Sequence, residues 1–248
     1  MILARLSKAI REQNWFAVAI EFVIVILGVV IGFQITAWNV KQQDVLLERE
    51  YLQRLEADLA ASEELLSEDI NNLRQWHRQA LNATEALISG DQGEISDFEF
   101  SRALVFGGRL QFVRGQYGTI DELISTGRMR LIRNSELRTL ITRTTNGLEE
   151  LDRLNALIGE RQNALVPFYR TRMLILNGFG EDTDVIYDFD ELAADEEFLN
   201  AFGNVTHLMT INIMWLEGAR DLVRELHAGV RAELGMPAVS YETSAAAT

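Results

Sequence analysis

The chain has 248 residues, a formal net charge of -14, no cysteine and two prolines. This length suits one compact domain with an appended segment better than two full domains. The absence of cysteine excludes disulfides and thiolate metal sites, although it leaves the compartment open. An acidic surface repels nucleic acid and anionic lipid headgroups, so no nucleic-acid partner is expected.

The first predicted element is an uncleaved transmembrane helix over residues 15–38. Between Trp15 and Trp38 the sequence reads FAVAIEFVIVILGVVIGFQITA, in which only Glu21 and Gln34 are strongly polar. At about 1.5 Å per residue it spans about 30 Å, the thickness of the hydrocarbon core of a bilayer. Trp15 and Trp38 fall where aromatic residues anchor a helix at the two membrane interfaces.

Two alternatives compete with a retained span. A cleavable signal peptide would have a shorter apolar core and a small-x-small cleavage site, whereas here the bulky Trp38 and a helical continuation follow. A buried helix of a soluble protein is seldom apolar on every face. Both comparisons favour a retained span in contact with the lipid bilayer.

The basic residues indicate an orientation. Residues 1–14 contain three of them, and so do the 20 residues after Trp38, so the density favours the short N-terminal side as cytoplasmic. Residues 1–41 carry a balance of +2, which leaves -16 for the remainder. We expect a short basic cytoplasmic segment at 1–14 and a periplasmic C-terminal domain, in the inner (cytoplasmic) membrane of a bacterium.

The predicted soluble domain, residues 39–236, begins with a long helix that continues from the span. After Trp38 no proline or glycine occurs until Gly90, and residues at seven-residue intervals are apolar: Val45, Leu52, Leu59, Leu66, Leu73, Ala80 and Leu87. The intermediate positions vary in character, which favours a helix packed on a bundle over a two-stranded zipper.

Capping signals divide the rest of the domain. Ser96 with Glu99, and Thr119 with Glu122, each predict a capping box at a helix start. Asn134 predicts the start of a longer helix to about residue 174.

Proline and glycine set the remaining boundaries. Pro167 is expected to kink or divide the helix that follows Asn134. A last helix ends near Gly235, and residues 237–248 are predicted to be a disordered tail. Because no stretch sustains the two-residue alternation of a strand, the predicted fold class is all-α, with an antiparallel helical bundle.

Two stretches, IEFVIVILGVVIGFQITAWN and TIDELISTGRMRLIRNSELRTLI, carry a family resemblance. They are similar to the anchor and the middle segment of a family of bacterial single-span membrane proteins of unknown function. The chain departs from that family at Ile20, where glycine is usual, and at Thr36 and Ala37, where asparagines are common. The resemblance implies architecture and no activity.

The polar residues of the span are candidates for a helix–helix interface. Glu21 lies about 9 Å inside the apolar slab, where a carboxylate must be paired, wetted or protonated. It can serve as a proton or ion site, contact a basic group on a partner helix or, as we favour, pair near the inner interface with Lys8 or Arg11 of the same or a neighbouring chain. Gln34 fits a hydrogen bond across a helix interface, and Gly28 and Gly32 allow close helix approach.

Self-association or another membrane protein is therefore the expected partner. Glu21 and Gln34 lie on different faces of an ideal helix, so one neighbour per helix would leave one of them in lipid. A ring of three or more subunits, or a hetero-complex, would satisfy both groups.

The sequence offers little for catalysis. His77, His207 and His227 show no metal-ligand spacing, and phosphate loops, dinucleotide fingerprints and nucleophile elbows are absent, so no catalytic, cofactor or metal residue is assigned. The basic cluster Arg128, Arg130, Arg133, Arg138 and Arg143 is expected to pair with the protein's own carboxylates.

Two function classes stay open. The first is a non-enzymatic assembly role, as a homo-oligomeric scaffold or an accessory subunit of a larger membrane complex. The second is an extracytoplasmic ligand-sensing module that signals through a partner. About 14 residues before the span are too few for an output domain, which favours assembly, whereas a tight apolar pocket with convergent polar groups would favour sensing.

Overall fold

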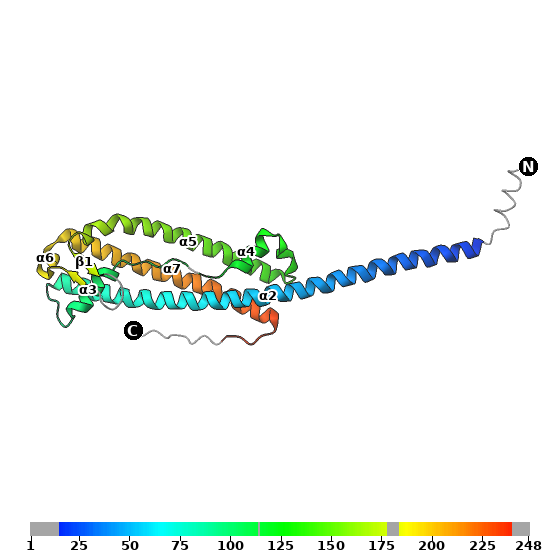
Figure 1. The fold of residues 1–248 in the computed structure, drawn as a ribbon, viewed down its shortest axis with the longest axis horizontal. Coiled ribbons are helices and arrows are strands. Elements are labelled where there is room, and N and C mark those ends of the chain that lie inside the picture. Colours follow the sequence, from blue (N-terminus) through cyan, green and yellow to red (C-terminus); the bar gives the residue numbers. More distant parts are fainter. Residues whose placement is uncertain (1–14, 114, 178–183, 240–248) are drawn as a thin grey trace, which may run out of the picture. The chain divides into compact units, whose positions relative to one another are not determined.

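The computed structural model describes residues 15–113, 115–177 and 184–239, and it divides into two compact units, Met1–Glu50 and Tyr51–Thr248. The predicted cytoplasmic segment, and residues 240–248 of the predicted tail, lie outside the described residues. The described chain is mostly helical (Figure 1).

Helix α2, Trp15–Ser89, contains both the apolar span and the predicted long helix, which confirms the expected continuity. Its apolar N-terminal part is long and apolar enough to cross a membrane, and none of that apolar window is buried. The helix ends before Gly90, whose φ of 70° is left-handed backbone that stops a helix.

The remaining elements belong to the unit Tyr51–Thr248. They are α3 (Asp97–Phe106), α4 (Gly118–Ser125), the short 3-10 helix η1 (Arg128–Leu131), α5 (Ser135–Arg170), β1 (Leu174–Asn177), β2 (Asp184–Ile186), α6 (Phe189–Ala194) and α7 (Glu196–Leu234). In Figure 1, α7 lies between α5 and the part of α2 that belongs to this unit.

The core of this unit is formed by the long helices α2, α5 and α7, together with buried side chains of α3, α4 and α6. Leu52, Leu59, Leu66 and Leu73 of the seven-residue repeat are all buried in it. Along the α5–α7 contact, Gly147 lies against Leu222 and Asn155 against Asn212, so residue numbers fall on α7 as they rise on α5.

Most predicted helix ends are confirmed. Ser96 and Glu99 form the capping box of α3, with the Glu99 backbone N–H donating to the Ser96 hydroxyl. The Asn134 side chain accepts from the first backbone N–H groups of α5. Gly235, with φ of 70°, follows the last residue of α7.

The capping box predicted for Thr119 and Glu122 is wrong. Helix α4 begins at Gly118, and its N-cap, Tyr117, makes no side-chain cap bond. The Thr119 N–H donates instead to Asp58 Oδ2 of α2, at 3.0 Å. Because a carboxylate from another helix satisfies this amide, the local box is not formed.

Helix α5 runs through Pro167 and ends three residues later, at Arg170, so Pro167 does not divide it. Proline removes one backbone donor, and so close to the C-terminus few helical bonds remain to be lost.

A short antiparallel hairpin, β1–β2, was not expected. Leu174 pairs with Ile186, and Ile175 with Val185. Val185 is buried in a small second core with Phe106, whereas Leu174 and Ile186 on the other face are exposed. Since the side chains on both faces are apolar, the sequence lacks the alternation by which a strand is recognised.

Candidate functional site

The residues predicted to form a helix–helix interface within the membrane all lie on α2. From 3.6 residues per turn, Glu21, Gly28 and Gly32 fall within about 40° of one another, whereas Gln34 lies about 140° from Glu21. All four positions are exposed, and a Cβ added at either glycine would meet nothing within 4 Å. Glu21, Gly28 and Gly32 thus lie on one face of the helix and Gln34 on another. Their role in a helix–helix interface stays a prediction.

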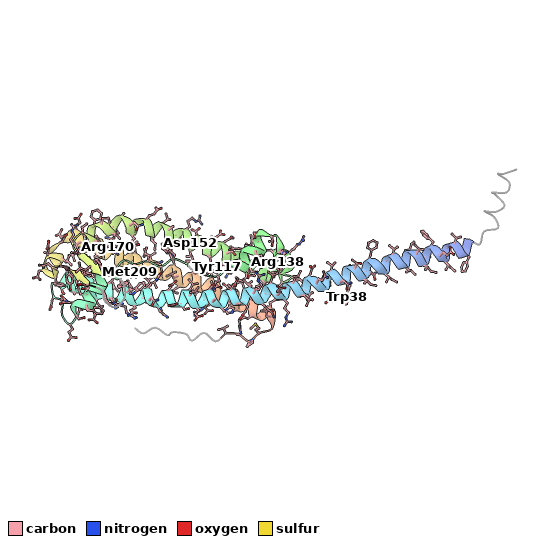
Figure 2. The ribbon with its side chains drawn as sticks, in the orientation of Figure 1. Trp38, Tyr117, Arg138, Asp152, Arg170 and Met209 are labelled. Atoms are coloured by element: carbon pink, nitrogen blue, oxygen red, sulfur yellow. The ribbon has the colours of Figure 1, made fainter. Side chains whose placement is uncertain are left out.

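The predicted interfacial anchors lie at the two ends of this apolar stretch. Trp38 is exposed on α2 (Figure 2). Trp15 is the first residue of the helix, and its side chain lies outside the described residues. Between them, the Thr36 hydroxyl donates to the Gly32 carbonyl at 3.0 Å, so this polar group is satisfied within its own helix.

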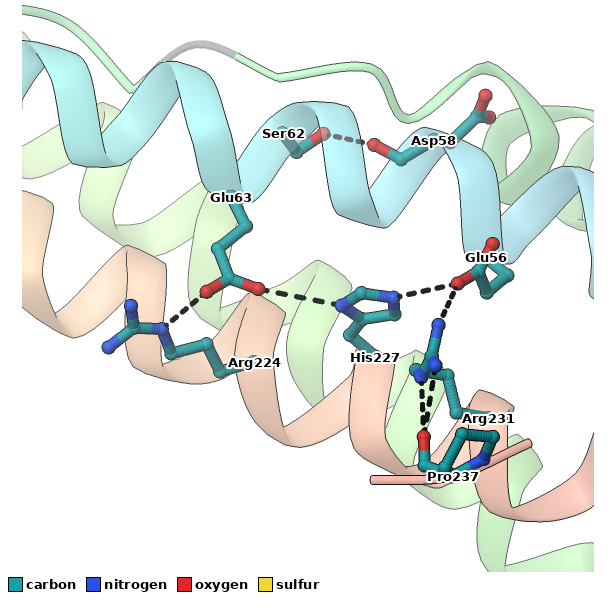
Figure 3. A network of polar contacts seen from close by, with 8 residues as sticks. All are labelled: Glu56, Asp58, Ser62, Glu63, Arg224, His227, Arg231 and Pro237. Atoms are coloured by element: carbon teal, nitrogen blue, oxygen red, sulfur yellow. Dashed lines mark hydrogen bonds and ion pairs between the residues drawn. The ribbon is translucent and has the colours of Figure 1, made fainter. Parts of the chain in front are cut away.

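A polar network joins α2 to α7 inside the second unit (Figure 3). His227 is 3% exposed, and its ring nitrogens face two carboxylates, with Nδ1 3.4 Å from Glu63 Oε2 and Nε2 3.3 Å from Glu56 Oε1. A neutral imidazole donates from one nitrogen only, whereas an imidazolium donates from both. We call Glu56, Glu63, Arg224, His227 and Arg231 the α2–α7 network.

Arginines complete this network at both ends. Arg224 Nε donates to Glu63 Oε1 at 2.7 Å, and Arg231 pairs with Glu56. Arg231 also donates to the carbonyl oxygen of Pro237, from Nε at 3.0 Å and Nη2 at 2.9 Å, which ties the segment after α7 back to the helix. Each carboxylate is therefore shared between the histidine and an arginine.

This network was not predicted from the sequence, although a signal for it was present. Glu56 and Glu63 are seven residues apart on α2, and Arg224 and Arg231 are seven residues apart on α7, with His227 between them. Opposite charges at equal spacing on two helices favour pairing along one seam. His227 itself gives no local signal in the sequence, and the structure shows it buried.

The connector between α3 and α4, residues 107–117, is held by side chains from the long helices. Asn212 of α7 accepts from the Gln111 N–H and donates to the Gln111 carbonyl, both at 2.8 Å. Asn155 of α5 donates to the same carbonyl at 3.2 Å and accepts from Asn212 at 2.7 Å. Both asparagines are buried, and their side chains supply the hydrogen bonds that the backbone N–H and carbonyl of Gln111 do not find in a helix or sheet.

Both ends of the connector also contact the long helices, the start by close packing and the end by a hydrogen bond. At its start, Gly108 adopts φ of 82°, and an added Cβ would lie 2.8 Å from Cβ of Val205. Near its end, the Gln116 N–H donates to the buried Ser62 hydroxyl of α2 at 2.7 Å. Burial raises the pKa of the neighbouring Tyr117 hydroxyl to about 12.

We expect Asn212→Ala to lower the free energy of unfolding by about 2 kcal/mol, because the half-buried Gln111 N–H loses its acceptor and the Gln111 carbonyl keeps only the bond from Asn155. Denaturant unfolding of the full chain in detergent measures the change. The matched control is Asn204→Ala, since the exposed Asn204 donates to the Asn200 carbonyl of its own helix. Equal losses in the two variants would contradict the assignment.

Three arginines of the predicted basic cluster bond to groups within the protein, two to carboxylates and one to backbone carbonyls. Arg128 lies 3.7 Å from Glu122, and Arg143 pairs with Glu225. Arg138 donates to the backbone carbonyls of Ile132 and Arg133. Hydrogen bonds from the Tyr51 hydroxyl and from Arg54 hold the pKa of Glu122 below its ordinary value.

No metal site was assigned from the sequence, and a tight apolar pocket with convergent polar groups was named only as the feature that would favour sensing. Among the described residues, no three histidine, cysteine or acidic side chains form a group that could hold a metal ion. His77 Nε2 contacts the Thr210 hydroxyl at 3.0 Å, and burial lowers the pKa of His77. A cleft at the hairpin is lined by Asp97, Phe98, Ser101, Asp184, Ile186, Tyr187 and their neighbours.

Comparison with protein-family models, with curated proteins and with solved structures finds no match to this chain. The resemblance of the anchor and middle segments to a family of single-span proteins therefore stays a prediction.

Proposed function

We propose that this chain is a membrane-anchored structural or assembly protein without catalysis, either a homo-oligomeric scaffold or an accessory subunit of a larger membrane complex. The observation that carries the proposal is the unburied apolar part of α2, which presents Glu21 and Gln34 on different faces. A carboxylate or amide held in lipid favours a partner that supplies a hydrogen bond or an opposite charge.

The proposed location is a bacterial inner membrane, with the N-terminus in the cytoplasm and the domain after the span in the periplasm. The basic residues before the span support this orientation. We also propose that this domain is an antiparallel bundle. The α2–α7 pairs support it, because Glu56 meets Arg231, Glu63 meets Arg224 and Arg74 meets Glu217.

The test is the mass of the complex extracted in mild detergent and in native nanodiscs, with co-purifying chains identified. We expect a defined homo-oligomer or hetero-complex, and we expect Glu21→Ala to weaken its association on the order of tenfold. The proposal rests on the natural protein being assembled, so a monomer in both media would overturn it.

A matched variant separates the role of the Glu21 carboxylate from general effects on the span. Phe22 is exposed and lies about 100° from Glu21 and about 120° from Gln34 around the helix, and Phe22→Ala also shortens one side chain. We expect Phe22→Ala to leave the mass of the complex unchanged. Equal dissociation in both variants would show that the effect is not specific to the carboxylate.

A further inference from the structure

The outer face of the β1–β2 hairpin is exposed but carries apolar side chains. Leu174, Leu176 and Ile186 are each 57% exposed, and the pairing of Leu174 with Ile186 places these two on one face, while Leu176 lies at the irregularity in the register of β1. The opposite face is already used, because Val185 is buried and Ile175 packs beside it. A hairpin with one packed face commonly presents polar side chains on the other.

This apolar face continues across the adjoining cleft to α3. Ile186 and Phe98 line the same cleft, and Phe98 is 47% exposed. Leu174 is paired with Ile186, and Leu176 lies two residues further along β1, so we group these three with Phe98 as the hairpin patch. Contiguous apolar patches bordered by polar groups mark interaction sites.

The charges at the patch indicate the chemistry of its partner. The cleft is lined by two carboxylates, Asp97 and Asp184, and by no basic side chain among the described lining residues. The guanidinium of Arg102 lies 5.7 Å from the Phe98 ring centre and 5.3 Å from that of the buried Phe106, but Arg102 does not line the cleft. A second copy of this chain would bring the same carboxylates together, which is unfavourable.

We infer that the hairpin patch docks a segment of a different protein, one that presents apolar side chains flanked by lysine or arginine. The apolar side chains would cover Leu174, Leu176 and Ile186, and the basic ones would meet Asp97 and Asp184. This inference rests on the proposed assembly function, and within it selects the accessory subunit of a hetero-complex. It places that contact outside the membrane span.

The test uses the photoreactive residue p-benzoylphenylalanine at position 186 of the full chain, irradiated in native membranes. Cross-linked peptides are identified by mass spectrometry. Leu157 of α5 is equally exposed, at 57%, and the same photoreactive residue there serves as the control position. We expect position 186 to give an adduct with another polypeptide, through a peptide of apolar residues with net positive charge, and position 157 to give none.

Charge reversal then tests the electrostatic part. The pair Asp97→Lys and Asp184→Lys is expected to lower the yield of this adduct about fivefold, whereas Asp152→Lys on the exposed surface of α5 is not. Matching unfolding midpoints show that the variants are folded. An adduct with a second copy, with lipid or with a peptide lacking basic residues would overturn the inference, as would no adduct or an unchanged yield.

The mass of the detergent-extracted complex, measured on the same membranes, distinguishes the two proposals. A complex that persists while position 186 forms no adduct contradicts the hairpin patch alone. A monomer contradicts the assembly function and, with it, the inference.

Discussion

Glu63→Ala is expected to lower the free energy of unfolding by about 3 kcal/mol. Glu63 bonds Arg224 at 2.7 Å and faces His227 at 3.4 Å, and its side chain is only 13% exposed. Removing the carboxylate leaves the buried imidazole and the guanidinium without their shared acceptor. Loss of one partner of a buried ion pair commonly costs about 3–5 kcal/mol, and the partial exposure of Arg224 places this case at the lower end.

Glu150→Ala provides a control of the same chemistry in water. Glu150 pairs with Arg153 on the surface of α5, where both side chains are more than half exposed. An exposed pair of this kind contributes about 0.5 kcal/mol or less. Denaturant unfolding of the full chain in detergent measures both variants. The α2–α7 network would not have the stabilising role described if Glu63→Ala were as mild as Glu150→Ala.

Phe202→Ala is expected to cost about 4 kcal/mol, because it deletes a fully buried ring from the core of the second unit. The ring stacks on Phe198 with 5.7 Å between centroids and meets the edge of Tyr169 at 5.8 Å. It also lies against Gly107, where an added Cβ would come within 2.7 Å of the ring. The cavity would thus open beneath the connector.

Phe112→Ala is the comparison for this second variant, since Phe112 belongs to the connector itself but is 54% exposed. We expect a loss below about 1 kcal/mol, because an exposed ring gives up little burial on deletion. The same unfolding measurement applies. If the two deletions proved equally costly, the core would not be centred on Phe202.

The long helices could be predicted because their determinants are local. The seven-residue repeat of α2 and the caps at Ser96, Asn134 and Gly235 use residues close together in the sequence, and the structure places the helix ends there. The capping box at Thr119 failed because the acceptor, Asp58, lies 61 residues earlier in the chain. Local patterns cannot reveal such a partner.

The candidate sites divide in the same way. Glu21 and Gln34 stand out from the sequence because they interrupt an apolar run, and the structure adds only that they are exposed on different faces. The α2–α7 network, the asparagine pair and the hairpin patch depend on which helices and strands become neighbours. Asn155 and Asn212 resemble ordinary polar helix residues in the sequence, and only the structure shows that both donate to the Gln111 carbonyl of the connector.

The way the connector is held has a consequence for the order of folding. Its backbone bonds come from Ser62, Asn155 and Asn212, which belong to three different helices. Contacts between residues far apart in sequence form only after the entropy of closing the intervening chain has been lost. The connector is therefore expected to settle late, after α2, α5 and α7 have met. Substitutions such as Asn212→Ala should then accelerate unfolding while leaving the refolding rate nearly unchanged.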